Sequence, residues 1–136
     1  MSETEPKLQA MGEQSGAQRP GGGEGWSRKQ ELGHLIDSAV NNRARFINAA
    51  LAGEYAGPSY DGDGWVSLGG YREMSWAEVV ALWAALNRAL AVVVGRIPDE
   101  RRPAPCRIGG GEPVTLEFVI ADYIDHMQQH LDHILG

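Results

Sequence analysis

Cysteine is almost absent from this chain, because Cys106 is the single one among 136 residues. One thiol cannot form an intramolecular disulfide, so the fold must be held by a packed core, and we expect a reducing cytoplasmic setting. The length is enough for one domain with its own core. A hydrophobic fraction of 43% and four tryptophans agree with a packed globular protein.

Basic runs and targeting signals are lacking as well. The 12 lysines and arginines form no long run and the formal net charge is -6, which argues against a nucleic-acid surface. Residues 1–25 are polar and glycine-rich, without the apolar centre of a signal peptide. We also expect no apolar run long enough to cross a membrane. The expected partner is therefore a small-molecule substrate, with neither nucleic acid nor membrane.

Several familiar site signatures are incomplete. The segment His126-Met-Gln-Gln-His130 has no glutamate after its first histidine, so it is not a zincin motif. A di-iron bundle needs a Glu-x-x-His on each of two helices, and the sequence has that spacing once, at Glu31 and His34. The glycines at 109–111 lack the Lys-Ser/Thr of a phosphate loop. Asp61 and Asp63 lack the glycine and glutamate spacing of a calcium loop. Cys106 lies in a predicted linker and is a poor nucleophile candidate.

Capping residues and apolar periodicity predict an all-α fold of four helices. Ser27 with Gln30 and Ser75 with Glu78 form capping boxes, and Thr115 caps a last helix. The expected helices span about 4–15, 28–51, 76–95 and 116–135. Residues 53–74 are expected to form a loop or crossover and 99–114 a flexible linker. We expect 1–25 to be a short helix with a glycine-rich linker and 26–136 to be the bundle, in one domain overall.

The apolar positions predict how these helices pack. The helix at 76–95 is apolar over most of its circumference and should be central. Tyr60 and Trp65, in the long loop, should pack over the bundle. The core stripe of the second helix is Leu32, Leu35, Ile36, Ala39, Phe46, Ile47 and Ala50, and that of the last is Leu116, Ile120, Ile124, Met127, Leu131 and Ile134.

The histidines carry the chemistry. His126 and His130 are four residues apart, so on a helix their rings lie one turn apart on the same face. His34 lies in the second helix, and helix bundles build metal sites from facing helices. The sequence therefore predicts that His34, His126 and His130 bind one divalent metal, zinc, nickel or iron. The alternative is that the histidines are solvated or helix-terminal, which suits His133 near the helix end.

A polar strip accompanies His34 on its helix. Asp37 on this strip and Asp122 on the last helix could accept the second N–H of a ligating imidazole. Asn41 and Arg45 further along the strip are predicted substrate contacts. Three imidazoles leave coordination positions open, as in catalytic sites, for a water of lowered pKa or a substrate thiolate.

Residues 26–135 resemble the DinB-like superfamily. The resemblance is specific in Trp26-Ser-Arg-Lys-Gln-Glu-Leu-Gly-His-Leu-Ile-Asp-Ser-Ala-Val-Asn-Asn42 and in Asp122-Tyr-Ile-Asp-His126 with His130-Leu131, and it extends to residues 76–87. It implies an up-down-down-up four-helix bundle with a long crossover between helices 2 and 3. It also implies that His34, His126 and His130 form a metal-binding triad.

Characterised relatives of that superfamily are metal-dependent transferases or isomerases that use thiols such as mycothiol or bacillithiol. The resemblance thus implies a thiol-dependent S-transferase whose metal activates a thiolate. The alternatives are a metal-dependent hydrolase and a non-enzymatic bundle that binds metal or a small molecule. Because the first helix is short and interrupted by glycine, a homodimer would supply missing cover.

Overall fold

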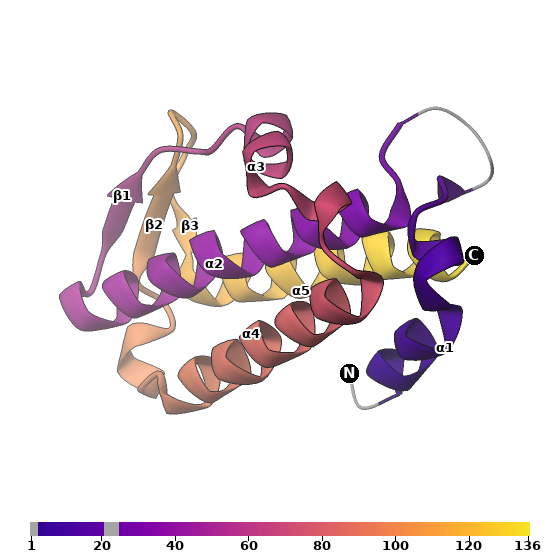
Figure 1. Cartoon of the computed structure of the whole chain (residues 1–136). Coiled ribbons are helices and arrows are strands. Elements are labelled where there is room, and N and C mark those ends of the chain that lie inside the picture. Colours follow the sequence, from indigo (N-terminus) through magenta and orange to yellow (C-terminus); the bar gives the residue numbers. More distant parts are fainter. Residues whose placement is uncertain (1–2, 21–24) are drawn as a thin grey trace.

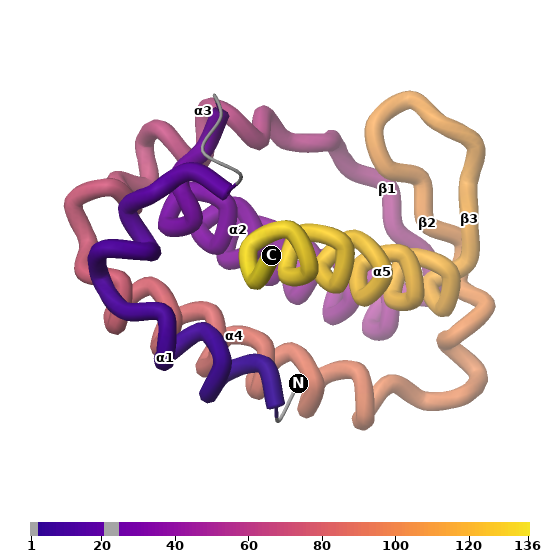
Figure 2. The backbone as a smooth tube through the Cα atoms, turned by 90° about the vertical axis from the view of Figure 1, so that its right-hand side faces the viewer, coloured from indigo at the N-terminus to yellow at the C-terminus, as the bar shows by residue number. Residues whose placement is uncertain are grey.

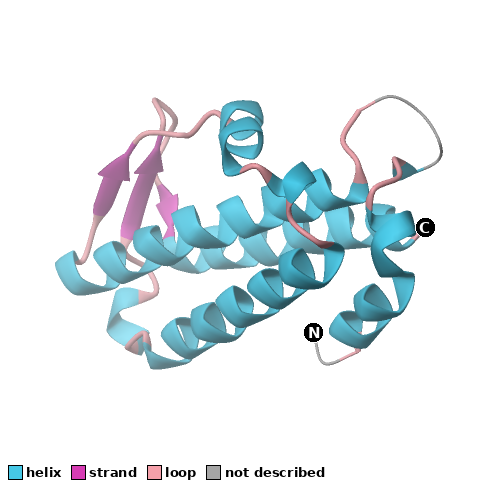
Figure 3. Cartoon of the chain, in the orientation of Figure 1, coloured by secondary structure: helices cyan, strands magenta, loops and turns pink. Residues whose placement is uncertain are grey.

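Four long helices dominate the computed structural model, which describes residues 3–20 and 25–136 (Figures 1 and 3). Residues 21–24 of the predicted glycine-rich linker lie outside the described part. The long helices match the predicted ranges to within two residues. Their bounds are α1 Thr4–Gly16, α2 Arg28–Ala52, α4 Trp76–Arg96 and α5 Leu116–Leu135.

The predicted caps are present. The Ser27 hydroxyl accepts the Gln30 N–H, while the Gln30 side chain accepts the Ser27 N–H, so both halves of the capping box form. Ser75 and Thr115 each accept a backbone N–H three residues ahead. These bonds satisfy donors that the first turn of a helix leaves free, which is why the starts of these helices follow from local sequence.

The central helix is α2, and the prediction that α4 would be central was wrong. α2 packs against α1, α3, α4 and α5. Five of its predicted core residues are buried: Leu32, Leu35, Ile36, Ala39 and Phe46. On α5, Ile124 is 52% exposed, whereas the neighbouring Tyr123 is buried and donates its hydroxyl proton to the Asn87 side chain. The rest of the α5 stripe is buried as predicted.

The expectation that no apolar run is long enough to cross a membrane does not hold for α4. An 18-residue window of this helix has a mean hydropathy of 1.7, so it is long and apolar enough to cross a membrane by length and composition. One third of that window is buried, in contact with α1 and α2. A core helix of a globular protein passes the same test, so the finding alone does not indicate a membrane.

The two predicted loops contain secondary structure. Pairing joins the strands in the order β1-β2-β3, with β1 and β2 parallel and β2 and β3 antiparallel. Strands of two to four residues leave no periodic signal in a sequence rich in glycine and proline, so both segments were expected to be irregular. The elements are β1 Tyr55–Gly57, α3 Gly62–Gly69, η2 Tyr71–Glu73, η3 Asp99–Arg101, β2 Pro105–Ile108 and β3 Val114–Thr115.

The segment between α2 and α4 returns along the bundle and covers one side of α2. In Figure 1, α2 and α4 run in the same direction and α5 runs against them. Tyr60 and Trp65 of this segment lie edge to face at 5.7 Å, and Tyr60 also bonds to Ser38 of α2. α1 breaks at Gly12, whose φ is +75°, so it does not run in one direction along the bundle. The up-down-down-up path therefore stays a prediction.

α1 shares the core of the bundle. Leu8 is fully buried, and its carbonyl accepts the indole N–H of Trp76 at 2.7 Å. The Glu13 carboxylate accepts the Trp76 backbone N–H at 3.0 Å. Figure 2 shows α1 against α4 near the end of the molecule where α5 terminates.

Candidate metal centre

Two helices far apart in sequence bring three histidines together. α2 supplies His34, and α5 supplies His126 and His130 from successive turns. One ring nitrogen from each lies within 4.8 Å of the other two. The ring of His34 lies 5.3 Å from that of His126 and 4.9 Å from that of His130, each edge to face. The three imidazoles therefore converge on one small volume between α2 and α5.

The spacing of the nitrogens fits a shared divalent ion. The Nε2 atoms of His126 and His130 are 3.2 Å apart. Two nitrogens bound to zinc at about 2.0–2.1 Å with tetrahedral angles would be about 3.3 Å apart. No hydrogen-bond partner is found for the buried Nδ1 of His34 within the described residues. The donor set, nitrogens only, is one that zinc, nickel and iron accept.

Burial favours the neutral form of His34 and His126, which is the form that binds a metal. Burial above all, together with the positive charges that His130 and His126 can carry, lowers the pKa of His34 to about 4. Glu31 and Asp63 act in the opposite direction. Burial, followed by His130, also lowers the pKa of His126. At neutral pH His34 therefore holds a free lone pair for a metal.

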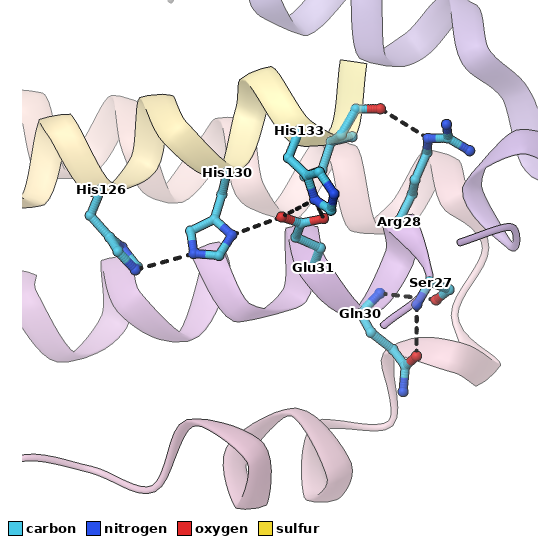
Figure 4. A network of polar contacts seen from close by, with 8 residues as sticks. Ser27, Arg28, Gln30, Glu31, His126, His130 and His133 are labelled. Carbon is cyan, nitrogen blue, oxygen red and sulfur yellow. Dashed lines mark hydrogen bonds and ion pairs between the residues drawn. The ribbon is translucent and has the colours of Figure 1, made fainter. Parts of the chain in front are cut away.

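Glu31 of α2 orients the rings on α5 (Figure 4). Its side chain is 6% exposed, and its carboxylate accepts the Nδ1–H of His130 at 2.8 Å. The other oxygen accepts the Nδ1–H of His133, also at 2.8 Å. Burial would raise the pKa of Glu31, but these two hydrogen bonds outweigh it, so its pKa is lowered. With its Nδ1 proton committed to Glu31, His130 directs Nε2 towards His126.

Trp26 and the start of α3 lie against the ring of His34. Its ring lies 5.0 Å from the ring of Trp26, which immediately precedes the Ser27 cap. A Cβ added to Gly62, at the start of α3, would lie 3.6 Å from Cε1 of His34. Trp26 and α3 therefore limit the access of solvent to this ring. His133 lies outside the cluster, with 63% of its side chain exposed.

The other predicted site residues have different surroundings. Asp37 is buried and accepts the Tyr71 hydroxyl at 2.6 Å, and Asp122 is exposed, raising the pKa of His126 through its charge. Asn41 donates to the backbone carbonyl of Asp37. Arg45 donates to the Pro58 carbonyl and lies over the Tyr60 ring. Their roles at a site stay predictions, while Glu31 holds the histidine contacts expected of Asp37 and Asp122.

Two residues that contact the histidine cluster, Glu31 and Trp26, were not predicted from the sequence. Glu31 precedes His34 by three residues, so the helical spacing already placed both side chains on one face. Its pairing with α5 depends on how the two helices pack. Nothing in the sequence indicated that Trp26, outside the helix, would lie against His34.

Comparisons with known proteins identify the family of the chain and a solved structure with a similar fold. No curated protein matches the chain. A solved structure from Bacillus subtilis, YfiT, is similar with a TM-score of 0.81 and 24% identity, over 97% of this chain and 78% of that chain. It is described as a probable metal-dependent hydrolase with an unusual four-helix bundle topology. The family model of the DinB superfamily matches residues 2–134, so the chain belongs to the DinB superfamily.

Proposed function

We propose that this protein is a metal-dependent enzyme in which His34, His126 and His130 hold one divalent ion. The observation that carries the proposal is the convergence of three ring nitrogens within 4.8 Å, with two of them 3.2 Å apart. A metal bound there would act as a Lewis acid and lower the pKa of a water or thiol. Zinc, nickel and iron suit the nitrogen donors.

The surrounding residues prepare the three imidazoles for this task. Glu31 holds the proton of His130 on Nδ1, which leaves the Nε2 lone pair for a ligand. Trp26 shields His34 from bulk water on one side. Three protein donors leave room for a further ligand, which is the pattern of catalytic rather than structural sites.

Hydrolysis is the reaction that demands least of the rest of the chain, since water is the only further reactant. Asn41 and Arg45, the predicted substrate contacts, donate to backbone carbonyls of their own chain. The similar structure of YfiT is itself described as a probable metal-dependent hydrolase. We therefore propose a hydrolase of a small molecule as the first reaction class.

A thiol-dependent transferase is the second candidate. Trp26, against His34, also lines a cleft of about 960 Å³ with the cationic side chain of Arg72. Such a cleft would suit the anionic end of a low-molecular-weight thiol whose sulfur reached the histidines. The resemblance to the superfamily supports the same reaction class.

Metal analysis and substrate assays test these proposals together. Protein purified without added metal should contain close to one divalent ion per chain, and His130→Ala should lose it. His133→Ala is the matched control, since it removes a histidine of α5 outside the cluster. Metal retained in full by His130→Ala would refute the site.

Substrate assays then separate the reaction classes. Metal-loaded protein that cleaves small esters or amides without added thiol would support the hydrolase. Turnover of an electrophile only with a thiol present would support the transferase. A protein that binds metal and turns over neither would be a non-enzymatic metal-binding bundle.

A further inference from the structure

A second group of polar side chains lies on α2 beyond the metal centre, around Arg45. Arg45 follows His34 by eleven residues, so the two side chains leave the helix within about 20° of each other. Side chains on a helix lean towards its N-terminus, so Arg45 leans towards the histidines. Its guanidinium donates to the Pro58 carbonyl at 3.1 Å and lies over the Tyr60 ring, 5.6 Å from the ring centre. These contacts hold the guanidinium on the side of α2 that carries His34.

The charge of Arg45 has no carboxylate partner among the described residues. The bond to Pro58 uses one of the five N–H donors of the guanidinium, which leaves donors for a further acceptor. The planar fork of these N–H groups matches the two oxygens of a carboxylate. A backbone carbonyl and an aromatic ring thus fix a cation that is able to bind an anionic ligand.

Tyr60 brings a hydroxyl to the same place. Its side chain is half-buried and bonds to Ser38, which lies one turn after His34 on α2. Burial raises the pKa of Tyr60, while the bond to Ser38 and the charge of Arg45 partly oppose the shift. The hydroxyl therefore keeps its proton at neutral pH and can donate it to an anion.

The Tyr60 hydroxyl lies on the side of α2 that faces α5. Burial and, to a smaller extent, Tyr60 raise the pKa of Tyr123, which precedes His126 on α5 by three residues. The Tyr123 hydroxyl already donates to Asn87 at 2.6 Å, so it has no proton to offer a ligand. Asp37 is the acid whose charge reaches Tyr60, and it is buried and accepts the hydroxyl proton of another tyrosine. Tyr60 is therefore the hydroxyl donor that stands beside Arg45.

We propose that Arg45 and Tyr60 bind a carboxylate of the substrate while its reacting carbonyl lies at the three histidines. The inference rests on the proposed function and names its substrate class, small amides or esters with a free carboxylate, such as N-acylated amino acids. The Cα atoms of His34 and Arg45 are about 16 Å apart along α2, and the lean of Arg45 shortens that span. An extended peptide of more than about five residues would exceed it, so the substrate is small.

Hydroxamates test the proposal, because their two oxygens bind zinc and anchor one end of the probe. Suberic monohydroxamate carries a carboxylate at its far end, and octanohydroxamate has the same chain without that charge. Isothermal titration calorimetry of the zinc-loaded protein should show about ten-fold tighter binding of the charged probe, because it adds charge-assisted hydrogen bonds. Adipic and sebacic monohydroxamates, which are shorter and longer, show at which distance the gain is largest.

Variants assign the gain to residues. Arg45→Met keeps an unbranched side chain without the charge, so it should abolish the gain and leave octanohydroxamate binding within about two-fold of wild type. Tyr60→Phe keeps the ring under Arg45 and should reduce the gain about three-fold. Arg43→Met is the matched control and should keep the full gain, because Arg43 is exposed and leaves α2 on the side opposite His34.

Four results would overturn the proposal. Octanohydroxamate that binds without any gain from a carboxylate, at every chain length, would show that no cation reads the far end. A gain retained by Arg45→Met would assign it to another cation, such as Arg72 in the cleft beside Trp26. A full gain in Tyr60→Phe would remove the hydroxyl from the site. Zinc-treated protein that fails to bind even octanohydroxamate would refute the metal centre, and this inference with it.

Discussion

Glu31 is a buried carboxylate whose charge is compensated by two imidazoles. A carboxylate that is 6% exposed would be costly without partners, and His130 and His133 supply the two donors. The arrangement joins α2 to α5 beside the three convergent rings. Arg28 adds a second link, donating to the Ile134 carbonyl at 2.9 Å. The first turns of α2 are thereby held against the last turns of α5.

Glu31→Gln should weaken binding of zinc. Glutamine replaces one of the two accepting oxygens by an NH2 group that cannot accept an imidazole N–H, and it carries no charge, so His130 becomes less basic and less firmly oriented. Loss of such a partner lowers metal affinity about 10- to 100-fold, which isothermal titration calorimetry would measure. Glu117→Gln, at an exposed position of α5, is the control and should bind as wild type does. Equal affinities in both variants would show that Glu31 does not position the ligand.

Asp37→Asn should change how stability depends on pH. Burial raises the pKa of Asp37 above 3.8, with the Tyr71 hydroxyl partly opposing the shift, so the folded state binds the proton more tightly than the unfolded state. This contribution favours the fold at low pH and is lost as pH rises through the raised pKa. The free energy of unfolding of Asp37→Asn should therefore improve relative to wild type between about pH 4, close to the unfolded pKa of 3.8, and about pH 7.

Urea denaturation of both proteins at the two pH values measures that difference. Asp125→Asn, at an exposed residue of α5, is the control, and we expect no pH-dependent gain there. A gain as large at the lower pH as at the higher would show that ionisation of Asp37 is not the cause.

At the scale of elements, the segment between α2 and α4 docks on α2 through a glycine. A Cβ added to Gly33 would lie 2.1 Å from the Tyr71 ring, so this ring occupies the space that a side chain would need. The same tyrosine donates to Asp37 one turn further along α2. The close approach of η2 to α2 therefore depends on residue 33 having no side chain.

Gly33→Ala should destabilise the protein even though alanine favours helix. The clash with Tyr71 should cost about 1–3 kcal/mol, against about 1 kcal/mol gained in helix propensity. Gly95→Ala is the matched substitution in α4, where an added Cβ would meet nothing within 4 Å. It should raise the free energy of unfolding by up to about 1 kcal/mol. Thermal denaturation of both variants would show opposite shifts, and a stabilising Gly33→Ala would contradict this account of the docking.

At the scale of the whole molecule, the histidine cluster joins α2 to the last helix, α5. Glu31 and His130 are 99 residues apart in sequence, so their contact closes most of the chain. A ligand shared by His34, His126 and His130 would bind the folded state alone. By mass action, such a ligand stabilises the fold as a whole.

Metal should therefore raise the melting temperature. Zinc at about 100 times its Kd adds about 2.7 kcal/mol. At roughly 4 °C per kcal/mol for a domain of this size, the rise is about 10 °C. Differential scanning calorimetry should show the rise reversed by a chelator, absent in His126→Ala and present in His133→Ala. An equal rise in His126→Ala would place the metal elsewhere.

The sequence by itself determined the long helices and the histidine triad. Capping bonds at Ser27, Ser75 and Thr115 act within one turn, so they can be recognised without knowledge of the fold. The four-residue spacing of His126 and His130 likewise places them on one face by helix geometry alone. His34 was predicted as the third ligand because it lies in another helix and bundles build metal sites from facing helices, and the resemblance to the superfamily implied the same triad.

Only the tertiary structure decided which polar groups serve the triad and which helix is central. Glu31 meets His130 and His133 because α2 and α5 pack antiparallel in one register, and no local pattern encodes that register. The short strands around Cys106 form by pairing segments about 50 residues apart, which leaves no periodicity to detect. The exposure of Leu82 and Val92 on α4 has the same origin, since an apolar helix is covered only where its neighbours reach it.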